Sequence, residues 1–241
     1  MSLVLVTGAS GALGRVLVPA LLTAGHQVRG MSRGPGRVAS AEEVVADVLD
    51  PASLPPALEG VDVVLHLASS PRKDARRTEV DGTGNLLAAR APGTPLVYLS
   101  IVGCDRTPFG YYRAKTAAEA LVREASDGHV VRATQFHGFA SSLVTPLPLL
   151  GRAVAPRGAL VQPVAEGFVA DVLVEAVADP AAAPAEVGGP EQLELAEVAR
   201  RVHGRRALTV PLPGRLGAAL RAGSLLAGPD ARTGGRPLPS R

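Results

Sequence analysis

The sequence has few of the residues from which several common kinds of site are built. It contains one cysteine, Cys104, no tryptophan, and only 3% aromatic residues. A single thiol excludes an intramolecular disulfide and leaves no cysteine cluster to bind a metal ion. No apolar run approaches the roughly 18 residues that span a bilayer, and no basic segment precedes an apolar one at the N-terminus. We therefore expect a cytoplasmic protein with no membrane partner and no metal site.

The shortage of aromatic residues leaves alanine, valine and leucine to form the core. Apolar residues make up 46% of the 241-residue chain, which is enough for a core of normal size in one α/β domain. Small aliphatic side chains of this kind suit a parallel sheet that is buried on both faces.

Positive charge is concentrated near the C-terminus. Residues 200–241 contain nine arginines and a single acidic residue, Asp230. A basic segment can bind nucleic acid, but glycine and proline interrupt this one, and no aromatic residue is placed to stack on bases. We expect no nucleic-acid partner and interpret the segment as one that packs against the protein's own acidic residues.

Strand and helix patterns alternate through the first 135 residues. Short apolar runs rich in valine predict strands, and longer amphipathic stretches predict helices. The strands are expected at 3–7, 27–31, 44–46, 61–67, 96–100 and 129–133, and the helices at 13–24, 51–58, 80–91 and 111–125. This alternation is typical of a Rossmann-type, doubly wound parallel sheet.

The pattern weakens after residue 135, where prolines are frequent. We expect a helix at 193–202, a strand at 207–210 and a helix at 214–226. The chain is thus predicted to form a single domain over residues 1–241. Within it, about 136–228 form a small C-terminal α/β lobe and 229–241 form a flexible tail.

A glycine-rich turn joins the first expected strand to the first helix. Its sequence, TGASGALG, begins at Thr7. In such turns the first glycine permits a tight bend, the second lets a pyrophosphate approach the backbone, and the third lets the helix pack on the strand. The helix start adds free amides and a positive dipole. The residues expected to hold the pyrophosphate of a dinucleotide are Gly8, Ser10, Gly11, Ala12, Leu13 and Gly14. The alternative is a glycine turn that binds nothing.

The end of the second strand indicates which dinucleotide binds. An NAD site usually has an acidic residue here, which bonds the ribose 2′-hydroxyl. This chain has Ser32 and Arg33 instead, and no acid before Glu42. A hydroxyl and a guanidinium suit a 2′-phosphate, so we expect NADP(H) to be preferred over NAD(H). The alternative is that Arg33 is a solvated loop residue.

Further candidates follow the third and fourth strands. Asp47 and Val48 are placed to contact the adenine, although Asp47 is equally suited to cap a helix or turn. His66, with strand neighbours on both sides, is interpreted as a hydrogen-bonded core histidine rather than a catalyst. The backbone after the fourth strand is expected beside the cofactor ribose, at Leu67, Ala68 and Ser69.

Tyr111 and Lys115 lie at the start of the expected helix at 111–125. They are four residues apart and therefore share one helix face. A phenol, with an ordinary pKa of about 10, is a poor acid or base at neutral pH, but a nearby ammonium favours the phenolate. Such a pair can act in general acid–base catalysis, and the lysine can also hold a ribose. Pairs at this spacing are common on solvated helices, so the evidence lies in the position after the fifth strand.

These segments together resemble one protein family. In their order and spacing, TGASGALG, HLAS, VDGTGNLL, VYLS and YYRAK are similar to the extended and atypical short-chain dehydrogenase/reductase superfamily, above all to its NmrA-like, NAD(P)-binding branch. RATQFHGF and GPEQLELAEVARRV, further along, also resemble that branch. The resemblance implies a Rossmann fold, bound NAD(P), and a substrate pocket covered by the C-terminal lobe. It also implies Tyr111 as general acid/base with Lys115 as its partner.

One position departs from the superfamily pattern. Extended members usually carry the catalytic serine or threonine two residues beyond the serine that ends the fifth strand, and that position here is Val102. Ser100 is the candidate replacement, and Cys104 a weaker one. This departure bears on turnover more than on cofactor binding.

The segment after the sixth strand supplies the remaining candidates. Gln135 and Phe136 are expected beside the nicotinamide, where their backbone groups can bond its carboxamide. His137 is a candidate substrate ligand or auxiliary acid/base, or else a loop residue. The other candidate substrate contacts are Ile101 and Tyr112.

The function expected from these residues is NADP-dependent reduction of a carbonyl or enone in a small organic molecule. One alternative uses the same fold without net redox chemistry, as an epimerase, dehydratase or cyclase. Another is a regulator that senses NAD(P) without turnover. We expect a monomer or a homodimer with a small-molecule substrate.

Overall fold

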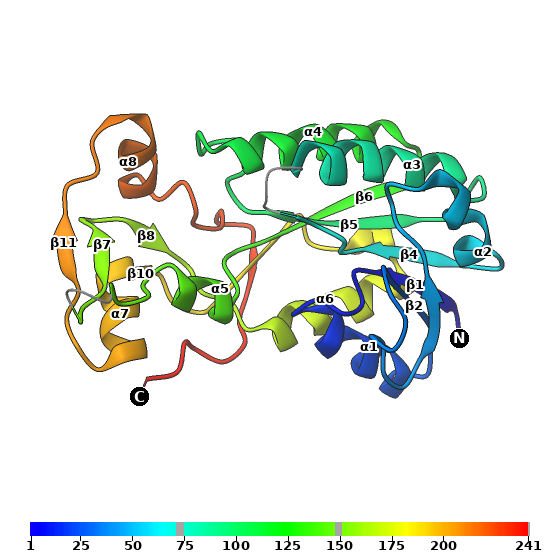
Figure 1. The fold of residues 1–241 in the computed structure, drawn as a ribbon, viewed down its shortest axis with the longest axis horizontal. Coiled ribbons are helices and arrows are strands. Elements are labelled where there is room, and N and C mark those ends of the chain that lie inside the picture. The colour runs from blue at the N-terminus through cyan, green and yellow to red at the C-terminus, as the bar shows by residue number, and fades with distance from the viewer. Residues whose placement is uncertain (71–74, 148–150, 241) are drawn as a thin grey trace. The chain divides into compact units, whose positions relative to one another are not determined.

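A parallel sheet of eight strands runs through the fold (Figure 1). The computed structural model describes residues 1–70, 75–147 and 151–240, so Arg241 of the basic segment lies outside it. The strands of this sheet are β1 (Leu3–Thr7), β2 (Gln27–Ser32), β3 (Glu42–Val45), β4 (Val63–His66), β5 (Leu96–Ile101), β6 (Gly128–Ala133), β9 (Glu186–Gly188) and β12 (Arg232–Thr233).

The strand order confirms the predicted Rossmann-type sheet. From one edge to the other it is β3-β2-β1-β4-β5-β6-β9-β12. Strand β1 lies between β2 and β4, with Thr7 opposite Met31 on one side and His66 on the other. The order reverses between β1 and β4, and ligands of such sheets bind at the carboxyl ends of the strands beside this reversal.

Helices cover both faces of β1 to β5. In Figure 1, α3 and α4 lie on one face and α1 and α6 on the other. Leu86 of α3 and Val122 of α4 pack with Leu5 and Leu96 in one buried cluster, so the core is aliphatic as expected. The helical segments are α1 (Gly14–Thr23), η1 (Pro51–Ser53), α2 (Leu54–Leu58), η2 (Arg77–Asp81), α3 (Gly82–Ala89), α4 (Gly110–Glu124), α6 (Glu166–Ala178) and η3 (Pro180–Ala182). None of the helices in the described ranges has the length and apolar character to cross a membrane.

The chain divides into two compact units. The first comprises Met1–Ser100, Arg113–Val131 and Val169–Ala183, and the second Ile101–Tyr112, Arg132–Phe168 and Pro184–Arg241. The second unit therefore contains most of the lobe expected at about 136–228, together with a segment that follows β5.

Two small sheets and three helices form much of the second unit. Strand β7 (Val154–Pro156) pairs in parallel with β11 (Leu208–Val210), and β8 (Leu160–Val161) pairs antiparallel with β10 (Leu193–Glu194). The helices are α5 (His137–Ser142), α7 (Leu195–His203) and α8 (Gly214–Arg221). Val198 and Ala199 of α7 are buried in an apolar cluster with Val144 and Val161.

The C-terminal half differs from the sequence analysis at one helix that was not predicted and at the expected tail. No helix was expected at 166–178, where α6 lies. Its sequence, EGFVADVLVEAVA, has only three charged residues, so the amphipathic period that marks a surface helix is weak. The described part of 229–241 is also not a separate tail, because β12 pairs with β9 and Leu238 is buried in the apolar cluster.

Candidate functional site

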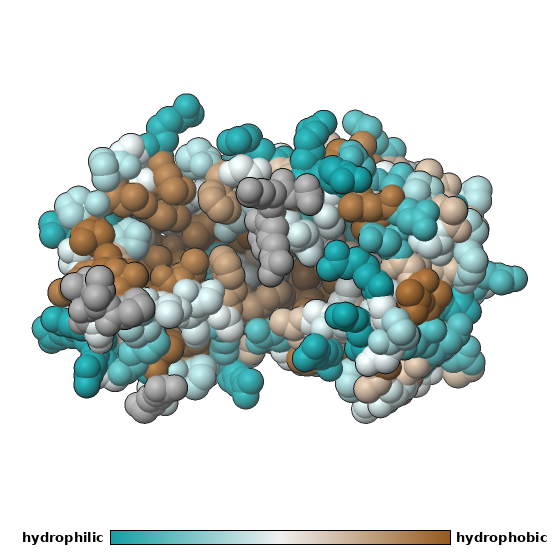
Figure 2. All heavy atoms as spheres, viewed as in Figure 1, coloured by the Kyte–Doolittle hydropathy of each residue, from teal (hydrophilic) through white to brown (hydrophobic). Residues whose placement is uncertain are grey.

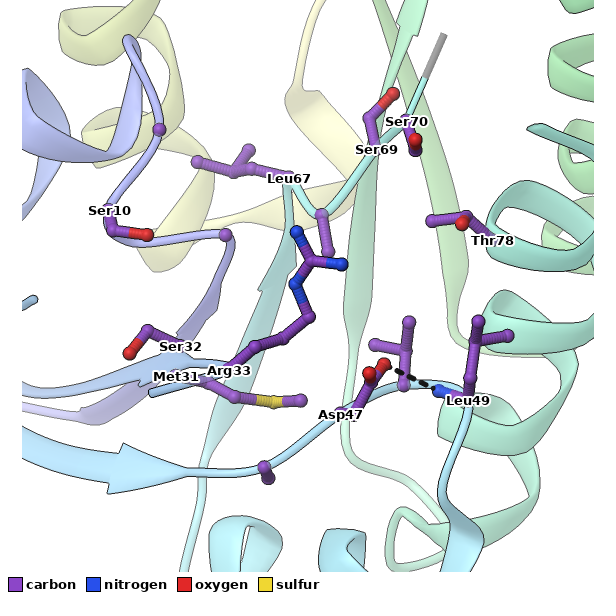
Figure 3. Close-up of a pocket in the computed structure, with 15 residues that line it drawn as sticks. Ser10, Met31, Ser32, Arg33, Asp47, Leu49, Leu67, Ser69, Ser70 and Thr78 are labelled. Atoms are coloured by element: carbon purple, nitrogen blue, oxygen red, sulfur yellow. Dashed lines mark hydrogen bonds between the residues drawn. The ribbon is translucent and has the colours of Figure 1, made fainter. Parts of the chain in front are cut away.

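A pocket lies at the carboxyl ends of β1, β2, β3 and β4, beside the reversal in strand order (Figure 3). Its volume is about 230 Å³. Most of the cofactor-binding residues predicted from the sequence line it. The lining residues are Gly8, Ser10 and Gly11 after β1; Met31, Ser32 and Arg33 at β2; Ala46, Asp47, Val48 and Leu49 after β3; Leu67, Ala68, Ser69 and Ser70 after β4; and Thr78 of η2.

Gly8 is required by the geometry at the end of β1. Its φ is +68°, and a Cβ there would lie 2.9 Å from the Ala68 amide nitrogen. The Thr7 hydroxyl oxygen accepts hydrogen bonds from the amides of Leu67 and Ala68, each at 3.1 Å. The glycine turn and the loop after β4 are thus held against each other and form adjoining walls of the pocket.

Gly11 and Gly14, the other two glycines of the turn, differ in the space around them. A Cβ at Gly11 would meet only the Gly8 carbonyl oxygen, at 3.1 Å, whereas a Cβ at Gly14 would lie 2.5 Å from the Ala9 oxygen. Gly11 is exposed and has one close backbone neighbour, whereas Gly14 allows α1 to pack on the turn. Among the described residues, the amides of Ala12 and Leu13 have no acceptor. Open backbone and free amides at a helix start fit a pyrophosphate.

The wall formed by β2 presents Arg33 to the pocket. Arg33 is exposed, and its side chain extends into the pocket in Figure 3. Within the described ranges, Arg33 donates no side-chain hydrogen bond and forms no ion pair. Ser32 is buried, and its hydroxyl donates to the Gly34 carbonyl at 2.7 Å. A hydroxyl has one proton, so Arg33 is the donor of this pair that remains available.

Asp47 forms part of the wall after β3. Its Oδ1 accepts a hydrogen bond from the Leu49 amide at 3.0 Å (Figure 3), and its own amide donates to Ser53 Oγ at 3.1 Å. The turn-capping role is confirmed. Contact of Asp47 or Val48 with an adenine stays a prediction, which their position in the pocket lining supports.

His66 is a core histidine whose hydrogen bonds fix its tautomer. Thr7 Oγ1 accepts from two amides, so its single proton donates to His66 Nδ1 at 2.8 Å. The proton of the neutral ring is then on Nε2, which donates to Thr83 Oγ1 at 3.1 Å. Burial lowers the pKa of His66 to about 4, with the Lys115 charge acting in the same direction. The predicted structural role of His66 is therefore confirmed.

Lys115 lies in a buried polar cluster rather than on a solvated helix face. Its side chain is only 4% exposed, and its Nζ is 3.1 Å from Oε2 of Glu79. The ammonium also donates to the Leu99 carbonyl at 3.0 Å and lies 4.5 Å from the centre of the Tyr98 ring. The lysine expected to assist Tyr111 thus has a carboxylate partner of its own.

Glu79 connects this lysine to the wall of the pocket. Its Oε1 accepts from the Ser69 hydroxyl at 2.7 Å and the Ser70 amide at 3.0 Å, and its Oε2 accepts from the Tyr98 hydroxyl at 2.9 Å. Burial raises the pKa of the Glu79 carboxyl, but Lys115 and the bonds from Ser69 and Ser70 outweigh burial and hold the pKa below its usual range. Glu79 and Lys115 therefore form an ionised pair beside the pocket.

Tyr111 and Lys115 lie one turn apart in α4, as predicted. Tyr111 is partly exposed, and its role as acid and base stays a prediction. Ser100 is 2% exposed near the end of β5. Val102 is fully buried and its amide donates to the Ala133 carbonyl at 3.0 Å, so residue 102 offers no donor to a substrate.

The Gln135 side chain connects segments of the second unit by hydrogen bonds. Its side-chain oxygen accepts from the Gln162 amide at 3.0 Å, and its side-chain nitrogen donates to the Leu225 carbonyl at 3.2 Å. Phe136 forms a parallel bridge with Val164. Only the backbone groups of Gln135 and Phe136 are therefore expected to contact a nicotinamide, and this contact stays a prediction.

His137 presents an unused acceptor. The residue is 8% exposed, and Nε2 has no partner among the described residues. Its ring is hydrogen-bonded to the Pro163 backbone, which assigns the ring proton to Nδ1. Burial is the main cause that lowers the pKa of His137. The ring is therefore neutral near pH 7, but its Nε2 atom is itself buried, so contact of His137 with a substrate stays a prediction.

The other two predicted substrate contacts differ in exposure. Ile101 is partly buried, but Tyr112 is 7% exposed and packs edge-to-face on Phe109 with ring centres 5.6 Å apart. Burial and the nearby Cys104 raise the pKa of Tyr112 to about 12. Tyr112 is a core residue of the second unit, and little of its ring is left to contact a substrate.

Glu79 and Tyr98 have functional contacts that their sequence neighbourhoods did not indicate. Each is far along the chain from Lys115, so no local spacing relates the three residues. The available signal was an acidic residue just before the apolar helical segment 80–91. A charge there indicates either a solvated turn or a buried partner, and only the fold distinguishes the two.

The first half of the chain is similar to known proteins. A family model described as NAD(P)H-binding matches residues 8–137. An uncharacterised protein of Mycobacterium tuberculosis is 43% identical over 89 residues, which are 36% of this chain and 10% of that protein. The 2-alkyl-3-oxoalkanoate reductase of Stenotrophomonas maltophilia is 31% identical over 153 residues, 52% of this chain and 46% of the reductase. The matches thus span a tenth of the first relative and under half of the second.

Solved structures resemble nearly the whole fold. A short-chain dehydrogenase/reductase superfamily protein from Agrobacterium tumefaciens with bound NAD has a TM-score of 0.67 at 22% identity, over 88% of this chain and 86% of that one. The dTDP-glucose 4,6-dehydratase of Bacillus anthracis in complex with NAD has a TM-score of 0.72 at 14% identity, over 89% and 86%. The chain belongs to the NAD(P)H-binding family and has the fold of the extended short-chain dehydrogenase/reductase superfamily.

Proposed function

We propose that the protein is an NADP(H)-dependent oxidoreductase that reduces a carbonyl or enone of a small organic molecule. The observation that carries the proposal is the pocket beside β1 and β4, into which Arg33 extends. The glycine turn suits the pyrophosphate, and a guanidinium suits a 2′-phosphate. We also propose that the protein is cytoplasmic and has no membrane or nucleic-acid partner.

The chain's own residues supply the proton that the substrate oxygen takes up. A bound nicotinamide supplies the hydride chemistry. Tyr111 is the proposed proton donor to the substrate oxygen, and Ser100 the proposed second donor. Lys115 lies one turn along the same helix, and a cation there favours the phenolate form of a tyrosine. Glu79 holds this lysine at 3.1 Å and reduces the net charge that the pair offers to Tyr111.

The surface of the second unit supports a substrate with a largely apolar body. Five large apolar side chains of this unit are at least 41% exposed: Phe109, Phe139, Leu143, Leu147 and Val210. Figure 2 shows apolar residues gathered on the visible face over the elements of this unit. Exposed apolar patches often mark sites where ligands bind.

Two observations favour a second candidate, a protein that binds NAD(P) without redox turnover. Val102 offers no hydrogen bond where extended members of the superfamily usually have a serine or threonine, and the charge of Lys115 is paired with Glu79. A regulator and a non-redox enzyme of this fold, such as an epimerase, a dehydratase or a cyclase, both remain compatible with these features.

The proposal is tested by identifying the bound dinucleotide and then measuring turnover. Mass spectrometry of the purified protein should find NADP(H). NADPH absorbance should then fall when the protein is mixed with members of a panel of apolar ketones, aldehydes and enones. Binding of NADPH without oxidation by any member would favour the regulator.

A further inference from the structure

The sequence of the loop that carries Arg33 does not by itself favour a single conformation. Residues 33–41 join β2 to β3 and contain no helix or strand. The segment includes Gly34, Pro35 and Gly36, and glycine gives a chain wide conformational freedom. A guanidinium on a mobile loop would lose entropy each time it bound a ligand. Contacts from outside the loop therefore decide how well Arg33 is placed.

One side chain of β3 binds this loop through three consecutive amides. Oε2 of Glu43 accepts from the amide of Gly36 at 2.7 Å, and Oε1 accepts from those of Arg37 at 2.8 Å and Val38 at 3.1 Å. Gly36 has a φ of +69°. This left-handed conformation turns the three amides toward one carboxylate. The bonds from Arg37 and Gly36 are the main causes that hold the pKa of Glu43 below its usual range.

The same end of the loop packs on bare backbone of β2. Gly30 lies opposite Glu43 in the sheet register. A Cβ on Gly30 would come within 2.4 Å of Cγ1 of Val38, so the valine occupies the space that a side chain would fill. Glu43 and Gly30 together fix residues 36–38 over the sheet.

The other end of the loop is fixed next to Arg33 itself. The Ser32 hydroxyl donates to the Gly34 carbonyl at 2.7 Å, and Ser32 Oγ lies 3.4 Å from Oε1 of Glu43. Arg33 stands between these two bonded residues. Its backbone is thus held from both sides, and its side chain extends into the pocket (Figure 3).

We infer that Glu43 is a positioning residue that sets the preference for NADP(H) over NAD(H) by fixing the loop that carries Arg33. The inference rests on the proposed NADP(H) dependence and deepens it. Glu43 does not line the pocket, so it acts through the loop and through Arg33 rather than by contact with the nucleotide.

Two effects of Glu43 on a 2′-phosphate have opposite signs. As an anion it repels a phosphate, but it is partly exposed and solvent screens that repulsion. As a clamp, that is, as the group that fixes the loop, Glu43 raises the fraction of molecules in which Arg33 is positioned to bind the 2′-phosphate. If loss of the clamp reduces that fraction to about one tenth, the apparent Kd for NADPH rises about ten-fold. The clamp is expected to be the larger effect, and the sign of the change distinguishes the two.

The experiment is calorimetric titration of the full chain with NADPH and with NADH. The variants are Glu43→Gln, which keeps the shape and removes the charge, and Glu43→Ala. The control is Glu42→Gln, because Glu42 is the neighbour on β3 and pairs with Arg29 at 2.7 Å instead of with the loop. NADH affinity checks folding, since NADH uses the same pyrophosphate site but has no 2′-phosphate.

The expected result is NADPH binding weakened about ten-fold in Glu43→Ala and less in Glu43→Gln, with NADH binding and Glu42→Gln unchanged. In the double variant with Arg33→Ala, the Glu43 substitution should add almost nothing, because both act through one interaction. Unchanged or tighter NADPH binding in the Glu43 variants, with NADPH still preferred by the unmodified protein, would overturn the inference alone. Preference of the unmodified protein for NADH would overturn the NADP(H) assignment and the inference with it.

Discussion

The ammonium of Lys115 lies 3.1 Å from the carboxylate of Glu79, and their side chains are only 4% and 0% exposed. Neither charge has water to solvate it, so each depends on the other and on the bonds around them. The Ser69 and Ser70 groups that bind Glu79 also line the pocket. The pair therefore links the stability of the first unit to the wall of the cofactor site.

Replacement of Glu79 by glutamine should destabilise the protein strongly. Glutamine keeps the volume but leaves a buried ammonium without its counter-charge, which typically costs about 3–5 kcal/mol. Urea unfolding at neutral pH measures the difference. Glu42→Gln is the control, because Glu42 is 57% exposed in its pair with Arg29 and such pairs contribute about 1 kcal/mol or less. Equal losses in the two variants would show that the Glu79 pair is not buried in solution.

The cost of Glu79→Gln should also depend on pH. The pKa of Glu79 is lowered in the folded protein from an ordinary 4.5. A carboxyl with a lowered pKa stabilises the fold fully above its ordinary value, and this contribution is lost as the pH falls through the folded value. The difference between the unmodified protein and the variant should therefore be constant above about pH 4.5 and shrink in more acid solution. A difference that grows on acidification would contradict the ionised pair.

His66 predicts a separate loss of stability in mild acid. Its pKa falls from 6.5 to about 4 on folding, so the unfolded chain takes up a proton between these values while the folded protein does not. Stability therefore falls as the pH is lowered from 6.5 to 4, by about 3 kcal/mol for a shift of this size. His66→Gln should flatten this part of the curve of unfolding free energy against pH. A curve unaltered in His66→Gln would contradict the assignment.

Local sequence was sufficient to predict the part of the site that one turn builds. The roles of Gly8, Gly11 and Gly14 follow from spacing within a single strand–turn–helix segment, and the structure has the required close approaches at Gly8 and Gly14. Strands β1, β4 and β5 were predictable for a similar reason, since parallel strands buried on both faces are nearly continuous apolar runs.

Features that depend on distant segments were not predictable. Glu79, Tyr98 and Lys115 meet only because η2, β5 and α4 pack together. Helix α6 buries one face and exposes only Asp171, Glu175 and Ala178 on the other, so the polar stripe that marks its period is weak. Strand β12 is two residues long and exists only through its pairing with β9. In each case the decisive information is a contact between segments rather than a pattern within one.

Arg33→Ala should weaken NADPH binding by roughly 1.5–3 kcal/mol, the contribution of a hydrogen bond to a charged group. NADH binding should be nearly unchanged, because NADH lacks the 2′-phosphate. Arg37→Ala is the matched control, since Arg37 is in the same loop and exposed but does not line the pocket. Calorimetry with both dinucleotides measures the effect, and equal losses for NADPH and NADH would contradict the assignment of Arg33.

Gly11→Val should abolish dinucleotide binding while the protein remains folded. A Cβ at Gly11 meets one atom, the Gly8 oxygen, at a tight 3.1 Å. The turn therefore has to shift slightly, and the side chain would fill the approach of the pyrophosphate. Gly84→Ala in α3 is the control, because a Cβ there has only one neighbour, at 4.0 Å. Circular dichroism verifies folding and calorimetry measures binding. Unchanged affinity in folded Gly11→Val would mean that the glycine turn is not the pyrophosphate site.

The most direct test of the proposed function is the rate at which Tyr111→Phe oxidises NADPH with a substrate that the unmodified protein reduces. Phenylalanine keeps the ring and removes the proton donor, and general acid catalysis typically contributes about 10²–10⁴-fold. We predict a fall in kcat on that scale with unchanged NADPH affinity. Tyr112→Phe is the control and should keep its kcat, because Tyr112 is a buried core residue. Full kcat in Tyr111→Phe would contradict the reductase mechanism and leave Tyr111 and Lys115 with a role in cofactor binding alone.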